Sequence, residues 1–120
     1  MSQRKAIAAA IRHLKGTWKS DRAKTESRWV FPKKMAQRRF KTWKTIFGKA
    51  RWRFTQTHLY AEYEGHRTVA AYKVLWADEC SAVLLIHGAD RDRIHHVHFD
   101  DRWIYLLAAR DIVEYFKRVD

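Results

Sequence analysis

The chain has 120 residues, of which 47% are hydrophobic and 14% aromatic, with four glycines and one proline. These values predict one domain, residues 1–120, with a buried core, and they exclude a disordered tail or a low-complexity linker. The single cysteine, Cys80, excludes an internal disulfide and a cysteine-based zinc cluster. A chain without disulfides and without a bilayer-spanning segment is typical of a cytoplasmic protein, which is the location we expect.

The net charge of +12 is unevenly distributed along the chain. Residues 1–53 hold 17 Lys and Arg against two acidic residues, a balance of +15, whereas residues 54–120 hold 8 against 11, a balance of −3. So uneven a charge attracts anions such as nucleic acid, an anionic membrane surface or an acidic ligand. Solvated faces of helices would give the same composition, so charge alone does not choose between these interpretations.

The first predicted element is a helix over residues 2–14. Ile7, Ile11 and Leu14 recur at the spacing of one helical face, and Ser2 can cap its start. A strand is predicted next, over residues 17–23.

A second helix is predicted over residues 32–47, between the first and second strands. Pro32 suits its first turn, and Gly48 follows its end as a C-cap. Its remaining faces are rich in lysine and arginine.

After Gly48 the hydrophobic period changes to two, which is typical of half-buried strands. Trp52 and Phe54 point to one side of the first of these, and Arg51 and Arg53 point to the other. The later predicted strands cover residues 58–64, 67–76, 80–87, 93–99, 102–107 and 112–119. Short strands separated by regular turns indicate a mainly β fold, an antiparallel meander of about eight strands that closes into a barrel.

The segment HLKGTWKSD, residues 13–21, resembles the opening of the lipocalin and calycin superfamily, in which a Gly-x-Trp follows an N-terminal helical turn. The chain is short for a secreted lipocalin and looks more like the compact lipocalin-like domains of bacterial proteins. The resemblance implies an eight-stranded barrel with Trp18 closing one end and an arginine of the last strand packed across it. Arg118 is the best positional match for that arginine, and Arg110 is the second.

The resemblance also implies that the barrel binds a small, partly apolar ligand without catalysis, and the basic chain suggests an anionic one. The candidate lining residues are inward-facing rings: Trp52, Phe54, Tyr72, Trp76, His95 and Trp103. Rings this large could also fill the lumen outright. The barrel would then be a structural or partner-binding protein.

Three histidines lie close together in RIHHVHFDD, residues 93–101. On a strand, His96 and His98 share one face, while His95 shares the other with Val97 and Phe99. A His-x-His pair can supply two zinc ligands, but a catalytic site needs a third protein ligand, which the sequence does not fix. We therefore predict no metal or other cofactor, with His96 and His98 as the candidates if one binds.

A basic surface that binds nucleic acid or another polyanion is the alternative function. Basic and aromatic residues interleave across the second predicted helix and the strand after it, as in grooves for single-stranded nucleic acid. The candidate cations are Lys33, Lys34, Arg38, Lys41, Lys44, Arg51 and Arg53. Motifs of nucleophilic, phosphate-loop or zinc-dependent catalysis are absent from the sequence, so we expect a protein that is not an enzyme.

Overall fold

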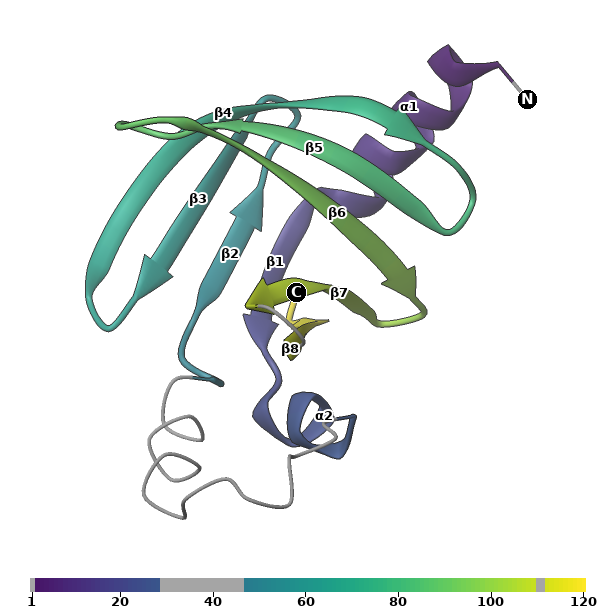
Figure 1. The fold of residues 1–120 in the computed structure, drawn as a ribbon. Coiled ribbons are helices and arrows are strands. Elements are labelled where there is room, and N and C mark those ends of the chain that lie inside the picture. Colours follow the sequence, from purple (N-terminus) through teal and green to yellow (C-terminus); the bar gives the residue numbers. More distant parts are fainter. Residues whose placement is uncertain (1, 29–46, 110–111) are drawn as a thin grey trace.

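The computed structural model describes residues 2–28, 47–109 and 112–120. Its strands form a closed barrel in which each strand is antiparallel to the next along the chain, and the last strand pairs with the first (Figure 1). The elements in chain order are α1 (Gln3–Leu14), β1 (Gly16–Ser20), α2 (Arg22–Ser27), β2 (Arg51–Phe54), β3 (His58–Tyr63), β4 (His66–Ala77), β5 (Ser81–His87), β6 (Asp92–Asp100), β7 (Trp103–Ala109) and β8 (Ile112–Arg118). The predicted mainly β, eight-stranded meander barrel is confirmed.

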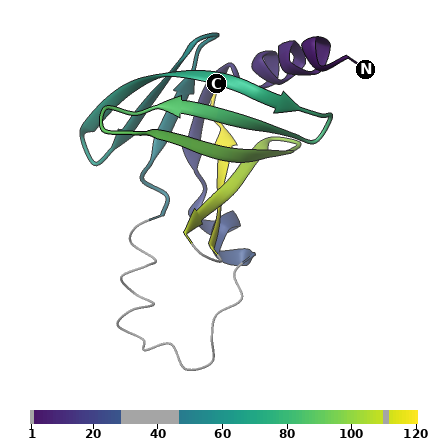
Figure 2. The same ribbon diagram turned by 45° about the horizontal axis from the view of Figure 1, so that its top comes forward.

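Helix α1 leads into β1 and packs on β4 and β5, while α2 lies at the opposite end of the barrel (Figures 1 and 2). The Ser2 hydroxyl accepts a hydrogen bond from the Lys5 amide, as an N-cap does. The Gln3 side-chain amide bonds to both the carbonyl and the amide of Ala77, at 2.9 and 3.2 Å. These contacts fix the helix against β4. Neither described helix could cross a membrane.

The chain turns into helix α2 directly after Ser20, so the strand predicted over residues 17–23 is wrong beyond that point. Asp21 is the reason, because its carboxylate accepts a hydrogen bond from the Lys24 amide and caps the new helix. Thr25 is fully buried, and its hydroxyl accepts a hydrogen bond from the amide of Tyr115 on β8. The helix predicted over residues 32–47 lies, except for Phe47, outside the described residues.

The core lies inside the barrel and extends beneath α1. It contains Ala10 and Leu14 of α1 together with inward-facing side chains of every strand, among them Trp18, Leu84 and Phe116. These three strand residues are completely buried. Since each strand alternates its faces, this core also determines which residues lie on the outer surface.

Candidate functional site

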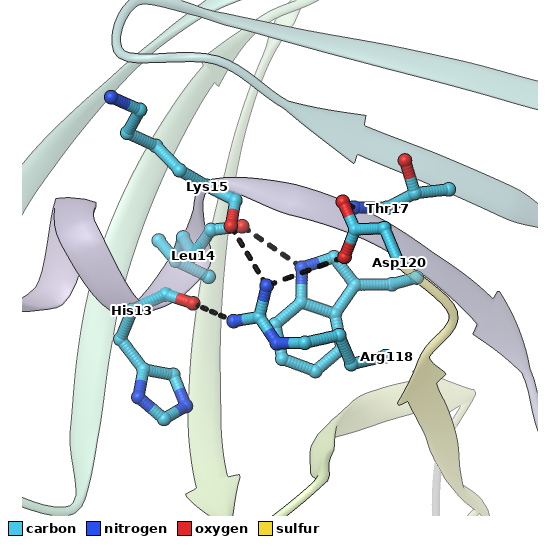
Figure 3. Close-up of polar contacts among 7 residues, drawn as sticks. His13, Leu14, Lys15, Thr17, Arg118 and Asp120 are labelled. Atoms are coloured by element: carbon cyan, nitrogen blue, oxygen red, sulfur yellow. Dashed lines mark hydrogen bonds and ion pairs between the residues drawn. The ribbon is translucent and has the colours of Figure 1, made fainter.

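Arg118 lies at the end of the barrel where α1 joins β1 (Figure 3), and it contacts the ring of Trp18. Trp18 is completely buried, and its indole N–H donates to the Leu14 carbonyl at 2.9 Å. The Arg118 guanidinium lies 4.3 Å from the centre of the Trp18 ring and donates to the carbonyls of His13 and Lys15. It therefore joins the end of α1 to β8. Arg110, the second candidate for this position, lies outside the described residues.

Gly16 leaves the space that Arg118 occupies. Its φ of +132° is one that L side chains rarely adopt, and a Cβ built there would lie 2.4 Å from Arg118 Nη1. Asp120 completes the arrangement, because its carboxylate accepts a hydrogen bond from the Thr17 amide at 2.8 Å. The residues that the family resemblance linked are thus brought into contact at one end of the barrel.

His13 was not identified from the sequence, although it lies at this same end. Its ring centre is 4.4 Å from that of Phe99. Burial, and then the charge of Arg118, lower the pKa of His13. Within the described part of the chain, His13 Nε2 is the buried side-chain nitrogen without a hydrogen-bond partner. The neutral ring therefore acts mainly in packing.

Three of the predicted ligand-lining rings lie inside the barrel and contact other rings. Trp52 stacks on Phe116 with ring centres 4.1 Å apart, and Phe54 meets Tyr72 edge to face at 5.3 Å. The Tyr72 hydroxyl donates to the Thr55 carbonyl at 2.6 Å, and burial raises its pKa to about 12. These rings occupy part of the interior with one another.

Trp76 lies on the outer surface, which corrects its placement in the lumen. The register between β4 and β5 shifts between Val74 and Trp76, as at a β-bulge. Ala77 consequently takes the inward position opposite Ala82, and Trp76 is 42% exposed.

Trp103 also lies on the outer surface, because Ile104 next to it is the residue that enters the core. Its indole N–H donates to the Asp21 carboxylate at 2.9 Å, and the Lys24 ammonium lies 4.5 Å from its ring centre. Trp103 therefore holds α2 against the barrel and does not line the lumen.

Two titratable groups on the inner face remain partly accessible. His95 lies opposite the buried Leu84, and burial, then the charge of Arg93, lower its pKa. Glu114 accepts a hydrogen bond from the Ser20 hydroxyl at 2.6 Å, and burial raises its pKa. His95 was predicted on this face from the sequence, whereas Glu114 was not, although its two-residue alternation with Phe116 indicates the same face.

Three cations lie side by side on the outer face of β8, β1 and β2, and we call them the cationic row: Lys117, Lys19 and Arg51. Lys19 is directly opposite Lys117 on one side and Arg51 on the other, and all three residues are exposed. Neighbouring strands are about 4.8 Å apart, so the row spans about 10 Å. Arg51 was predicted from the sequence as a candidate cation, whereas Lys19 and Lys117 were not.

Two surface grooves share residues with the cationic row. One, of about 400 Å³, is lined by Lys19, Ser20, Asp21, Arg22, Phe47, Gly48, Lys49, Lys117 and Val119. The other, of about 320 Å³, is lined by Thr17, Arg51, Arg53, Tyr60, Ala61, Glu62, Arg67 and Thr68, and we call it the arginine groove. The predicted cations Lys33, Lys34, Arg38, Lys41 and Lys44 lie outside the described residues.

His96 and His98 lie next to each other on the outer face of β6, with ring centres 4.2 Å apart. His96 Nε2 is 2.8 Å from the Ser81 hydroxyl, and the His98 ring stacks on Tyr105 at 4.8 Å. In the parts of the chain that the structure describes, no three His, Cys, Asp or Glu side chains are grouped to hold a metal ion. The pair thus takes part in hydrogen bonding and ring stacking.

Comparisons of the chain with protein-family models, with curated proteins and with solved structures found no match. The closed eight-stranded barrel is compatible with a lipocalin-like fold. Function must therefore be argued from the chemistry of the surfaces and the interior.

Proposed function

We propose that this protein binds a phosphate-rich polyanion through the cationic row and the grooves beside it. The observation that carries the proposal is the position of Lys19, directly opposite both Lys117 and Arg51. Like charges placed directly opposite each other on neighbouring strands destabilise a sheet. A bound polyanion would offset this repulsion, because its negative charges would attract all three cations.

One carboxylate lies directly beside the cationic row, because Glu62 of β3 is opposite Arg51, and it forms an ion pair with Arg67 at 3.8 Å. In the described residues, the salt bridges of the chain involve other basic side chains, and Lys19, Arg51 and Lys117 take part in none of them. The charge of Lys117 acts on the carboxylate of Asp21. That carboxylate already accepts hydrogen bonds from the Trp103 indole and from the Lys24 amide. The positive charge of the row is therefore available to a ligand.

Inorganic polyphosphate tests the proposal, because it carries phosphate charge and no base or lipid. We expect the variant Lys19→Gln/Arg51→Gln/Lys117→Gln to bind polyphosphate about tenfold or more weakly at low salt, since each phosphate contact contributes through counterion release. A control with the same change in net charge is Arg4→Gln/Lys73→Gln/Arg91→Gln, whose residues are exposed elsewhere. Its affinity should stay within about twofold of the original protein. Equal losses in both variants would overturn the proposal, because affinity would then follow net charge alone.

A second candidate function is binding of a small, partly apolar ligand inside the barrel. Its support is that Trp52, His95 and Glu114 lie on the inner faces of their strands and yet are only partly buried, so each leaves part of its side chain accessible. Native mass spectrometry of freshly purified protein should then show a retained small molecule, or titration should show uptake of a fluorescent fatty acid or of an uncharged apolar dye. A bare mass without uptake of either probe would contradict this candidate.

A further inference from the structure

We infer that the polyanion is a single-stranded nucleic acid and that one of its bases stacks in the arginine groove, at Tyr60 and Arg53. This inference rests on the proposed function, because it uses the cationic row to hold the phosphates. It adds the chemical class of the ligand and a residue that distinguishes bases from phosphate alone.

Tyr60 offers an aromatic ring on the outer face of β3. It is 40% exposed, and it lies directly opposite Arg53 of β2. The Arg53 guanidinium lies 4.1 Å from the centre of the Tyr60 ring, which is a cation–π contact. The two flat groups together form a stacking surface, on which a base can contact the exposed part of the ring or the guanidinium plane.

The two grooves beside the cationic row differ in the groups that they offer. The larger groove has three lysines and Arg22 among its cations, and its aromatic residue, Phe47, is only 7% exposed. The arginine groove has Arg51, Arg53 and Arg67 together with the exposed Tyr60. Lysine is a point charge, whereas arginine and tyrosine present planes that stack on bases. The arginine groove is therefore the one suited to a base.

Arg51 connects phosphate binding with base binding. It belongs to the cationic row through its pairing with Lys19, and it also lines the arginine groove. A strand whose phosphates follow the row can therefore enter the groove at Arg51, beside Glu62, whose carboxylate pairs with Arg67. Single-stranded nucleic acid uses this combination of cations and aromatic rings, because its bases are free to leave the stack. A duplex keeps its bases paired and would contact the cations alone.

The test measures the affinities of Tyr60→Ala and Tyr60→Phe for three ligands at one low salt concentration. The ligands are a labelled single-stranded oligothymidylate, a DNA duplex of the same length, and inorganic polyphosphate. We expect Tyr60→Ala to weaken binding of the single strand about 5- to 100-fold, the range that loss of one stacked base gives. Tyr60→Phe keeps the ring and should bind the single strand within about twofold of the original protein.

Polyphosphate separates this inference from the proposed function and also reports that the variant is folded. We expect Tyr60→Ala to bind polyphosphate as the original protein does. If the original protein binds polyphosphate and Tyr60→Ala binds the single strand without loss, the inference is overturned and the proposed function stands. Tighter binding of the duplex than of the single strand would also overturn the inference. If the original protein binds no polyphosphate, the proposed function fails, whatever the effect of Tyr60.

Discussion

Gly16 is a single residue whose lack of a side chain allows Arg118 to pack on Trp18 at one end of the barrel. The resemblance to the lipocalin and calycin superfamily implied the contact between Trp18 and an arginine of the last strand, for which Arg118 was the best positional match. The sequence did not predict the burial of His13, because that depends on Phe99, a residue more than eighty positions away that approaches only in the folded barrel. Residue identities thus indicated the local motif, and tertiary packing added the neighbours.

The variant Gly16→Ala should be clearly less stable, by about 2–4 kcal/mol, because it combines a strained backbone angle with a displaced Arg118. Gly65→Ala is the matched control, since Gly65 also has a positive φ, +84°, but a Cβ there would meet nothing within 4 Å. Urea unfolding should show that Gly16→Ala loses at least about 1 kcal/mol more than Gly65→Ala. Equal losses would mean that the close approach of Arg118 is unimportant.

Strand alternation was the most reliable guide at the scale of elements. The period-two pattern of Arg51, Trp52, Arg53 and Phe54 correctly separated the basic outer face of β2 from its inner face. The same reasoning failed for Trp76, because its apolar neighbours give no sign of the bulge that reverses the faces there.

Pairings between elements distant in the sequence lie beyond the reach of local patterns. Lys19 and Lys117 are separated by almost the whole chain and become neighbours only because β8 closes the barrel against β1. Glu114 meets Ser20 across the same pair of strands. The sequence could therefore indicate a basic half of the protein, while the cationic row itself depends on barrel closure.

At the scale of the whole molecule, folding brings together basic residues that lie in the two halves of the sequence. Lys19, Arg51 and Arg53 of the basic half lie on the outer face of β1 and β2, and closure adds Lys117 from the other half. Because Lys19 lies between two other cations, its charge should reduce stability in the absence of ligand and contribute to binding in its presence.

Thermal unfolding of Lys19→Gln and the original protein, at low salt with and without polyphosphate, tests this central claim most directly. Without polyphosphate the variant should be more stable, by about 0.2–1 kcal/mol, because two unfavourable cross-strand pairs are relieved. An excess of polyphosphate should raise the unfolding temperature of the original protein more than that of the variant, since the ligand stabilises the state to which it binds. A variant that is less stable without polyphosphate, or equal stabilisation of both proteins by polyphosphate, would contradict the account.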